Sequence, residues 1–441
     1  MAQSNILPSA LAAARFCASR IRSTCTSRTF SSTRLALVSQ KPVAVPTAAE
    51  LDTFVGMKSE FPCLQGTAGP EPTYSSRGTG AEVYHHDQPF KLRWGGVLPE
   101  VNIAYETWGT LNEERNNVIC IFCGVSPTSH AKSNEKDPSD GWWEEFIGPN
   151  RPLDTNHFFI ICANNLGSCF GTTGPSSTNP LTGEPYAMSF PIITLQDCVR
   201  AQFLLLDHLG IGKIYGAVGA SAGGMLSIAA GVLFTDRVER IVSISAGLKS
   251  LPSAIAFRFM QRQSLMGDPN WNLGNYYGKK YPARGMKWNR MLGMLTYRCG
   301  PEWENRFGLK RVTDDMPSMC PDFEIESYLD HQGHKLGGIM DPNSQMYLSK
   351  AVDLFHIADG QESYDAALEK IKCPVLVVGV QTDILIPVSQ QKHMASELRR
   401  TGNTSVTYFE IDTEYGHDTF LLDRTNVGTA MKGFLELGNQ F

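Results

Sequence analysis

Two kinds of apolar pattern alternate along the chain from residue 101 onward. Short runs rich in Val, Ile, Phe and other strand-forming residues predict buried β-strands. These predicted strands cover residues 101–108, 117–123, 157–163, 213–218, 238–245, 374–380 and 405–411. Apolar positions at helical spacing predict helices over 195–209 and 225–234. Strands that alternate with helices are typical of an α/β protein with a mostly parallel sheet.

One long segment interrupts this alternation. Residues 248–355 are rich in Met, Arg, Tyr and Trp, and their apolar positions follow helical rather than strand spacing. This pattern predicts a helical cap that is inserted after about the sixth strand, encloses the cleft and carries substrate selectivity. The remaining parts, 46–247 and 356–441, then form one α/β core. A chain of 441 residues that is 42% hydrophobic is large and apolar enough for such a core with an insertion.

Ser221 lies at the junction of a predicted strand and a predicted helix. It is the central residue of the pentapeptide GASAG at 219–223. Small residues two positions before and after a serine let the chain make the sharp, strained turn that exposes a nucleophilic hydroxyl. The pentapeptide alone is weak evidence in a chain with 40 glycines. A nucleophilic role for Ser221 therefore depends on an acid and a base elsewhere in the chain.

An acid and a histidine follow Ser221, each just after a late predicted strand. Asp383 follows the strand at 374–380, and His417 follows the strand at 405–411. Loops at the carboxyl ends of parallel strands carry the chemistry of such sheets. Because a hydroxyl is a weak nucleophile at its own pKa, we expect His417 to take the proton of Ser221 and Asp383 to orient the imidazole and stabilise the imidazolium. The alternative is that Asp383 caps a turn and His417 lies on a surface loop.

The same chemistry needs donors for the negative charge that develops on the attacked carbonyl oxygen. We expect these donors to be the backbone N–H of Ala222 and that of Val125, in the loop after the strand at 117–123. Cys120 and Cys123 have a spacing seen in metal sites, but they lie within that predicted strand, where core packing explains them. The sequence therefore predicts neither a metal nor a bound cofactor.

The first 45 residues differ in composition from the rest of the chain. They contain five arginines among many Ser, Thr and Ala, and the first acidic residue is Glu50. This composition is typical of a mitochondrial transit peptide, and the segment RTFSS at 28–32 predicts cleavage near Phe30 to Ser31. We therefore expect the mature protein in the mitochondrial matrix. A disordered basic tail is the alternative for 1–45.

Charge, hydropathy and cysteine usage exclude several classes of protein. The formal net charge is −5, and no basic stripe with interleaved aromatic residues occurs, which argues against nucleic-acid binding. No apolar run approaches the ~18–20 residues that cross a bilayer, so we expect a soluble protein without a membrane partner. The 11 cysteines are odd in number and scattered through predicted strands, which favours buried, reduced thiols over disulfides.

Short motifs along nearly the whole chain after residue 90 resemble those of one enzyme family. They include GWWE at 141–144, NNLGSC at 164–169, GPSS at 174–177, GASAGGM at 219–225, QRQ at 261–263, TYR at 296–298 and GHD at 416–418. With these motifs, the chain resembles the homoserine O-acetyltransferases, which are acyltransferases of the α/β-hydrolase fold. The resemblance implies transfer of an acyl group from acyl-CoA, a co-substrate, to the hydroxyl of a small amino acid. The implied route is ping-pong, through an acyl-serine.

The resemblance also assigns roles to individual residues. It implies that Ser221, Asp383 and His417 form the catalytic triad. It implies further that Arg262 and Asp418 hold the carboxylate and the ammonium group of the amino acid. A planar guanidinium suits a carboxylate because it can bind both oxygens. From the residues alone, a solvated helix arginine and a turn-forming aspartate are the alternatives for Arg262 and Asp418.

Two segments depart from the pattern of that family. The acetyltransferases usually have His-Ala-Leu-Thr-Gly where this chain has CGVSP at 123–127, so the wall formed by Gly124, Val125, Ser126 and Pro127 beside the acyl and acceptor pockets differs. Ile339 stands where the family commonly has an arginine. Together with the leader, these differences resemble the fungal serine O-acyltransferase branch, which is similar to a serine O-succinyltransferase of cysteine synthesis.

Three activities remain open on this basis. We expect an O-acyltransferase that acts on L-serine and favours succinyl-CoA over acetyl-CoA. The alternatives are a homoserine O-acetyltransferase of methionine biosynthesis and a serine hydrolase or esterase that uses the same triad on water. A binding module without catalysis is disfavoured because all three triad residues are present. The expected partners are small molecules, and the sequence leaves both a monomer and a homodimer open.

Overall fold

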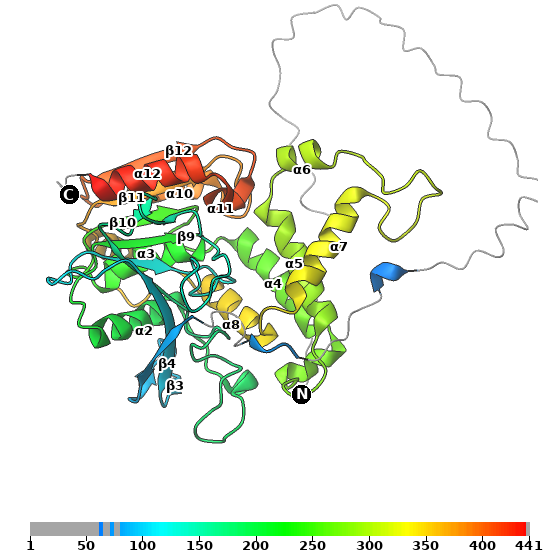
Figure 1. Ribbon diagram of the computed structural model, residues 1–441, viewed down its shortest axis with the longest axis horizontal. Coiled ribbons are helices and arrows are strands. Elements are labelled where there is room, and N and C mark those ends of the chain that lie inside the picture. Colours follow the sequence, from blue (N-terminus) through cyan, green and yellow to red (C-terminus); the bar gives the residue numbers. More distant parts are fainter. Residues whose placement is uncertain (1–60, 65–70, 75–79, 438–441) are drawn as a thin grey trace, which may run out of the picture. The chain divides into compact units, whose positions relative to one another are not determined.

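The computed structural model of the chain describes residues 61–64, 71–74 and 80–437. All of them belong to one contact unit, Glu60–Phe441. The predicted transit peptide and its cleavage site lie outside the described residues. Within the described part, the apolar runs form one large sheet, and the segments of helical spacing form the helices (Figure 1).

All seven predicted strands occur in a single sheet of eight strands. Their order across the sheet is β1 (Glu82–His86), β4 (Val101–Trp108), β8 (Phe159–Ala163), β5 (Val118–Phe122), β9 (Gly216–Ala220), β10 (Ile241–Ile244), β11 (Val375–Val380) and β12 (Val406–Ile411). β4 is antiparallel to both of its neighbours, and the other pairs of neighbouring strands are parallel. The predicted mostly parallel sheet is confirmed.

The helices lie between the strands and after the last one. They are α2 (Leu195–His208), α3 (Ala222–Leu233), α4 (Pro252–Met266), α5 (Ala283–Tyr297), α6 (Gly300–Arg306), α7 (Glu324–Gly337), α8 (Pro342–Asp353), α9 (Tyr364–Glu369), α10 (Val388–Arg400), α11 (Thr419–Leu422) and α12 (Arg424–Glu436). The short elements are η1 (Pro62–Leu64), β2 (Phe90–Lys91), β3 (Val97–Leu98), β6 (Ile147–Gly148), β7 (Leu153–Asp154), η3 (Ala187–Ser189), η4 (Pro269–Gly274) and η5 (Gly416–Asp418). Both predicted helices are present, as α2 and α3.

The strand and the helix around Ser221 extend closer to it than predicted. The strand was expected over 213–218, but Ile214 forms only an isolated bridge, and β9 continues to Ala220. α3 begins directly after Ser221 rather than at residue 225. The small residues at 219–223 carry no apolar periodicity, so the sequence pattern placed both ends too far from the serine. The result is a turn made by Ser221 alone.

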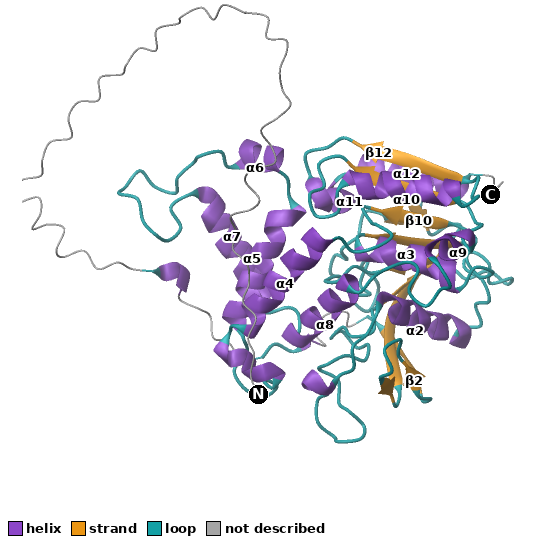
Figure 2. Cartoon of the chain, turned by 180° about the vertical axis from the view of Figure 1, so that it is seen from behind, coloured by secondary structure: helices purple, strands orange, loops and turns teal. Residues whose placement is uncertain are grey.

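Successive residues of the central strands point to opposite faces of the sheet. In β5, Cys120 and Phe122 pack in the same buried cluster as α2, α3 and α10. Ile119 and Ile121 pack in a second cluster with α12 and Trp143. Helices therefore cover both faces of the sheet (Figure 2). This explains why the central strands are continuous apolar runs rather than alternating ones.

The segment 248–355, predicted as a helical cap, contains α4 to α8. It lies between β10 and β11, which are the sixth and seventh strands of the large sheet in chain order. Figure 1 shows α4, α5 and α7 side by side. α8 packs differently, because its Met346, Leu348 and Ala351 belong to the same buried cluster as α2 and α3. The last helix of the insertion is thus anchored in the core of the sheet.

One pair of cysteines contradicts the prediction of reduced thiols. Cys63 and Cys320 form a disulfide, with 5.8 Å between their Cα atoms and 257 residues between them in sequence. The prediction rested on burial within strands, and neither residue lies in a strand. A pairing at this separation also leaves no local sequence pattern. The other described cysteines are free: Cys120, Cys123, Cys162, Cys169, Cys198, Cys299 and Cys373. Burial raises the pKa of the Cys120 and Cys198 thiols, so they stay protonated.

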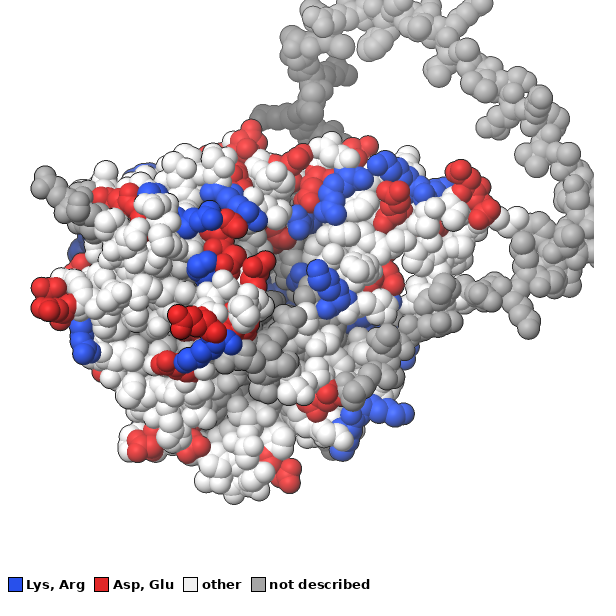
Figure 3. Space-filling view, in the orientation of Figure 1, with Lys and Arg blue, Asp and Glu red and all other residues white. Residues whose placement is uncertain are grey.

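Three observations on the described residues bear on partners. No helix among them is long and apolar enough to cross a membrane. They contain no group of three or more His, Cys, Asp or Glu side chains arranged to hold a metal ion. On the face shown in Figure 3, basic and acidic side chains are interspersed. The candidate chemistry lies at the carboxyl edge of the parallel strands, where Ser221, Asp383 and His417 follow β9, β11 and β12.

Candidate active site

Ser221 occupies a strained backbone conformation between β9 and α3. Its φ and ψ are 57° and −124°, a region that side-chain-bearing residues rarely adopt and that costs on the order of 1–3 kcal/mol. The turn is held because the Ser221 N–H donates to the carbonyl oxygen of Ile244 in β10 at 2.9 Å. A Cβ on Gly219 would lie 2.2 Å from the Gly223 carbonyl oxygen. The glycines of GASAG are therefore required by close backbone approach, and the serine hydroxyl is presented at the head of α3.

The three predicted triad residues form one hydrogen-bonded chain. His417 Nε2 lies 2.8 Å from Ser221 Oγ, and His417 Nδ1 lies 2.7 Å from Asp383 Oδ2. The other carboxylate oxygen of Asp383 accepts the backbone N–H groups of Leu385 and Ile386 at 2.9 Å each. These two bonds fix the carboxylate, and the carboxylate fixes the imidazole with Nε2 toward the serine. The arrangement suits proton transfer from Ser221 to His417.

The environment of His417 makes it a stronger base than an ordinary histidine. Burial lowers its pKa, but the negative charge of Asp383, the hydrogen bond to that carboxylate and the charge of Asp418 outweigh burial, and the net pKa is raised above the usual value. His417 is only 3% exposed, so the surface-loop alternative is wrong. Asp383 does cap a turn, and it contacts His417 at the same time.

The loop that carries His417 is fixed by contacts with the end of α5. Gly416 has a φ of +61°, and a Cβ there would lie 3.0 Å from the carbonyl oxygen of Tyr297. The imidazole has the ring of Tyr297 at 6.3 Å and that of Phe420 at 5.7 Å between centroids. Gly416 N–H donates to Thr382 Oγ1 at 3.2 Å, which ties this loop to the one that carries Asp383. The helical insertion thus helps to hold the base.

The predicted oxyanion donors lie on two segments that touch each other. Ala222 is the first residue of α3, where the N–H has no acceptor within the helix. A Cβ on the next residue, Gly223, would lie 2.1 Å from the carbonyl oxygen of Phe122, at the end of β5. Val125 follows in the loop after β5, and no described residue accepts a hydrogen bond from its N–H. Both N–H groups are available for a developing negative charge.

Arg262 is a buried residue of α4 and not the solvated helix arginine of the alternative interpretation. It is 7% exposed, its Nη2 lies 2.6 Å from Asp353 Oδ2, and its Nη1 donates to Ser349 Oγ at 2.8 Å. Arg258, one turn earlier, binds the other oxygen of Asp353 at 2.6 Å. Two guanidinium groups therefore share one carboxylate. The three side chains together carry one more positive than negative charge.

Asp418 directly follows His417 in sequence and is half-buried. Burial raises its pKa, although the positive charges of Arg298, His417 and Arg290 act in the opposite direction. Arg298 Nη2 lies 3.3 Å from Asp418 Oδ2. The residue is thus more than a turn former, and it places a carboxyl group beside the triad.

Sequence reasoning missed the residues that hold these groups. Asp353 and Arg298, the partners of Arg262 and Asp418, lie 91 and 120 positions away from them in sequence. Asn165 donates to the carbonyl oxygens of Cys123 and Gly124, at the start of the predicted specificity loop at 124–127. Its position just after β8, the strand next to β5, was the signal available for it. Ile339 is half-buried between α7 and α8.

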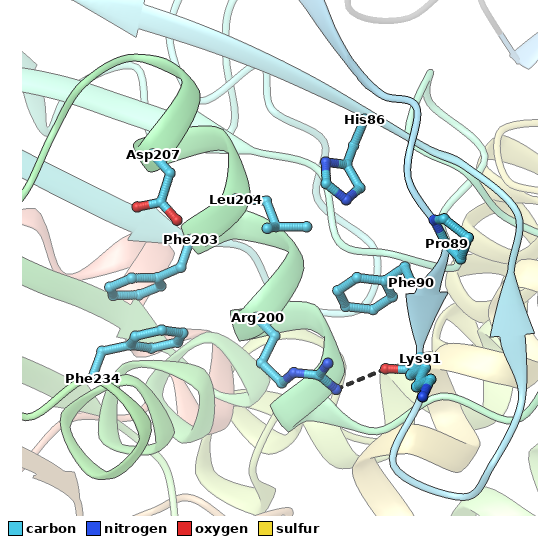
Figure 4. Close-up of a pocket in the computed structure, with 9 residues that line it drawn as sticks. All are labelled: His86, Pro89, Phe90, Lys91, Arg200, Phe203, Leu204, Asp207 and Phe234. Carbon is cyan, nitrogen blue, oxygen red and sulfur yellow. Dashed lines mark hydrogen bonds between the residues drawn. The ribbon is translucent and has the colours of Figure 1, made fainter.

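A surface pocket of about 410 Å³ lies away from these residues. It is lined by α2, by the end of β1 with β2 and the segment between them, and by Phe234, which follows the far end of α3 from Ser221 (Figure 4). A 12-residue helix spans about 18 Å, so the pocket is remote from the triad. Its Arg200 is already bound to the Lys91 carbonyl oxygen at 2.9 Å and to Asp197 at 3.0 Å. None of the predicted site residues lines it.

Comparison with known proteins shows the family of this chain. A family model described as alpha/beta hydrolase fold matches residues 137–423. The chain is 44% identical to the serine O-succinyltransferase of Emericella nidulans, covering 85% of this chain and 87% of that protein. It is 41% identical to the homoserine O-acetyltransferase of Carboxydothermus hydrogenoformans, covering 78% of this chain and 92% of that protein.

Solved structures give the same result for the fold. The homoserine O-acetyltransferase from Bacillus anthracis matches with a TM-score of 0.76 and 29% identity, over 80% of this chain and 97% of that chain. Esterase E22 matches with a TM-score of 0.73 and 29% identity, over 80% and 99%. The predicted fold and the predicted family are both confirmed, and the enzyme is an O-acyltransferase. The chain belongs to the homoserine O-acetyltransferase family of α/β-hydrolase-fold enzymes.

Proposed function

We propose that this protein transfers an acyl group from acyl-CoA to the hydroxyl of L-serine, and that it favours succinyl-CoA over acetyl-CoA. The observation that carries the proposal is the hydrogen-bonded chain from Ser221 through His417 to Asp383, in a sequence so similar to a fungal serine O-succinyltransferase. The O-acylserine formed would serve cysteine synthesis. The proposal applies to a monomer and to a homodimer alike.

In the first half-reaction, Ser221 becomes acylated. Its Oγ attacks the thioester carbonyl while its proton passes to His417 Nε2, and the carbonyl oxygen becomes an oxyanion that accepts the N–H groups of Ala222 and Val125. When the tetrahedral intermediate collapses, the C–S bond breaks, and the leaving sulfur takes the proton from His417. The products are free CoA and an ester on Ser221. Neither a metal nor a bound cofactor takes part in this scheme.

In the second half-reaction, the amino acid takes the place of CoA. His417 removes the proton of the acceptor hydroxyl, which attacks the acyl-serine ester. The second tetrahedral intermediate collapses with breakage of the ester C–O bond, and Ser221 Oγ regains its proton from His417. The same two N–H groups serve both intermediates.

Two charged residues would hold the zwitterionic acceptor. Arg262 would bind its carboxylate, since the Arg258–Asp353–Arg262 group carries an excess positive charge. Asp418 would bind its ammonium group, since it directly follows the base in sequence. With both ends of the amino acid held, its hydroxyl would be directed toward the acyl-serine.

Selection between serine and homoserine is a matter of one methylene group, worth only about 1–3 kcal/mol in an apolar pocket. We assign this selection to the loop formed by Gly124, Val125, Ser126 and Pro127, which replaces the family's usual sequence beside the acceptor. The succinyl group carries a second carboxylate, which requires an additional hydrogen-bond donor in the protein. The preference between succinyl-CoA and acetyl-CoA can therefore be measured separately from the preference between serine and homoserine.

A matrix of substrates tests the proposal. CoA release is measured with succinyl-CoA and with acetyl-CoA, each with L-serine, with L-homoserine and without an amino acid. We expect the highest kcat/KM for serine with succinyl-CoA, and little release after the first turnover without an acceptor. A preference for homoserine with acetyl-CoA would return the chain to that parent activity. Steady release without an acceptor would show a hydrolase, the activity suggested by the name of esterase E22.

The same proposal includes the mitochondrial matrix as the place of action. It rests on the arginine-rich composition of residues 1–45, which lacks acidic side chains.

A further inference from the structure

We propose that Asn165 is the positioning residue of the oxyanion hole: its side-chain amide fixes the peptide between Gly124 and Val125 so that the Val125 N–H faces the reacting carbonyl. This inference rests on the proposed function, which makes Val125 a donor. Asn165 itself touches no reacting atom. It acts through the backbone of the loop after β5.

The placement of Asn165 follows from the sheet. β8 and β5 are parallel neighbours, with Ala163 opposite Phe122 at their ends. Asn165, two residues beyond β8, therefore lies beside the loop that leaves β5. Its Nδ2 donates to the carbonyl oxygen of Cys123 at 3.1 Å and to that of Gly124 at 3.0 Å. One amide group holds two successive peptides of this loop.

The orientation of that amide is determined by its other end. Asn165 Oδ1 accepts Gln202 Nε2 of α2 at 3.2 Å. If the amide were turned over, its oxygen would face two carbonyl oxygens and its NH₂ would face the NH₂ of Gln202. Asn165 and Gln202 are both buried, with exposed fractions of 4% and 1%, so water could not supply the hydrogen bonds lost in that orientation. The donor must therefore point at the loop.

A fixed carbonyl fixes the next N–H. No described peptide bond is cis, and in a trans peptide the C=O and the following N–H point in opposite directions. Because the Gly124 carbonyl points at Asn165, the Val125 N–H points away from Asn165. That N–H has no acceptor among the described residues. The direction of the Val125 N–H is therefore set by the hydrogen bond from Asn165 to the Gly124 carbonyl, and not by a hydrogen bond that the Val125 N–H itself makes.

Contacts on both sides of the loop keep this orientation from relaxing. On the side of Ser221, a Cβ on Gly223 would lie 2.1 Å from the Phe122 carbonyl oxygen and 3.4 Å from the carbonyl carbon of Cys123. The first turn of α3 therefore contacts the start of the loop. On the far side, Trp142 Nε1 donates to the Thr128 carbonyl oxygen at 2.8 Å. Between these two contacts, Asn165 is the side chain that holds the Gly124 carbonyl.

Removal of the Asn165 amide should therefore slow both acylation of Ser221 and transfer to the acceptor, and should leave the binding of acyl-CoA and of the acceptor unchanged. Loss of one oxyanion donor typically lowers kcat by about 10²–10³-fold. For Asn165→Leu, of similar size but without the donor, we expect kcat and the acylation rate to fall about 10–100-fold, with KM for acyl-CoA and for the acceptor within about threefold. For Asn165→Asp we expect at least as large a loss, because a carboxylate would face two carbonyl oxygens.

The experiment uses an alkyl fluorophosphonate probe on the full-length protein. Ser221 Oγ forms a bond to phosphorus, the P–F bond breaks, fluoride leaves and the serine proton passes to His417; the phosphoryl oxygen uses the same N–H groups as a substrate oxyanion. We expect Asn165→Leu to be labelled about 10–100-fold more slowly than the wild type. The pH midpoint of labelling should not change, because the triad is intact.

Asn403→Leu is a matched control. The Asn403 amide is 4% exposed and also donates to two carbonyl oxygens, those of Ile371 at 2.8 Å and Cys373 at 2.9 Å, far along the chain from the loop. It should lose comparable thermal stability and keep the wild-type labelling rate. Equal slowing in both variants, or wild-type labelling in Asn165→Leu, would overturn the inference.

Two further measurements keep the test decisive. If Asn165→Leu does not fold, Gln202→Met removes only the partner that orients the amide, and we expect a smaller loss, about 3–10-fold; a labelling rate equal to the wild type would then contradict the inference. If the wild type is not labelled at Ser221, the proposed function fails instead.

Discussion

At the scale of single residues, the chemistry depends on how burial and charge oppose each other at His417. Burial alone would make this histidine a weak base, but Asp383 holds its Nδ1 at 2.7 Å and keeps the positive form stable. Ser221 is available to it because a strained turn, fixed by two glycines, directs the hydroxyl to Nε2. The proposed nucleophile and the proposed base are thus positioned by their surroundings before any substrate binds.

The first prediction concerns the nucleophile. We expect Ser221→Ala to lower acyl transfer by more than about 10⁴-fold while the protein remains folded, because each half-reaction passes through the acyl-serine. Intact-mass spectrometry of the wild type mixed with acyl-CoA alone should show one added acyl group. Circular dichroism of the variant is the control for folding. An adduct on a cysteine, or none under rapid quench, would contradict the covalent route.

The second prediction concerns pH. His417 must be neutral to accept a proton, and its pKa is raised above 6.5, so the acylation rate should fall as the pH drops through a midpoint above 6.5. Because the pKa of His417 is higher in the folded protein than in the unfolded chain, protonation of His417 stabilises the folded state. This stabilisation is fully present below the ordinary pKa of histidine and is lost as the pH rises through the raised pKa. Asp383→Asn should lower both the rate and the midpoint. A wild-type midpoint below 6.5, measured by CoA release, would be inconsistent with this environment.

The third prediction concerns Arg262. If it holds the acceptor carboxylate, Arg262→Lys should raise the acceptor KM by about tenfold or more, because an ammonium group cannot replace a planar fork, and should leave the first half-reaction nearly unchanged. Arg258→Lys is the matched control, since it alters the same Asp353 pair but not the proposed substrate ligand. Equal losses in both half-reactions would indicate a purely structural arginine.

At the scale of elements, short contacts between loops and helix ends hold the site together. The His417 loop packs against the end of α5, through Gly416 and Tyr297, so an element of the helical insertion supports the base. The loop after β5 packs against the head of α3 in the same way. The sheet edge alone therefore does not define the active site.

The fourth prediction tests this support. Gly416→Ala should destabilise the protein by more than the ~1–2 kcal/mol of a positive φ, because the new Cβ would also lie 3.0 Å from the Tyr297 carbonyl oxygen, and it should lower kcat by displacing His417. Gly402→Ala is the control, since Gly402 has a φ of +95° and open space around it. The Gly402→Ala variant should lose only the stability that a positive φ costs an alanine, and it should keep full activity. Urea unfolding and steady-state kinetics measure the two effects.

At the scale of the whole molecule, residues 1–45 have the arginine-rich composition expected of a leader, and the proposed catalytic groups lie in the part of the chain that the structure describes. The fifth prediction is that protein isolated from mitochondria begins between about residues 29 and 46, because the arginine-rich leader has no core-forming pattern. N-terminal sequencing checks this. Met1 or Ala2 at the start of protein from the cytosolic fraction would overturn the localisation.

Without reductant, the denatured mature protein should show seven free thiols, since Cys63 and Cys320 are paired.

The order of apolar runs in the sequence determined the strands, the parallel sheet and the position of the triad. Periodicities of about two and 3.6 residues are local properties, and parallel strands bring their carboxyl ends to one edge, so the sequence alone groups Ser221, Asp383 and His417 at that edge. The ends of β9 and α3 were less accurate, because small residues carry no periodicity.

Only the tertiary structure decided which side chains are partners. Arg262 pairs with Asp353, Cys63 with Cys320, and Asn165 with the Gly124 carbonyl, all between segments remote in sequence. Such pairings depend on where folded elements meet, and an arginine, a cysteine or an asparagine has many potential partners in a chain of 441 residues. The sequence therefore determined which residues are the candidate catalytic groups, whereas the packing of the elements decided how those groups are held and oriented.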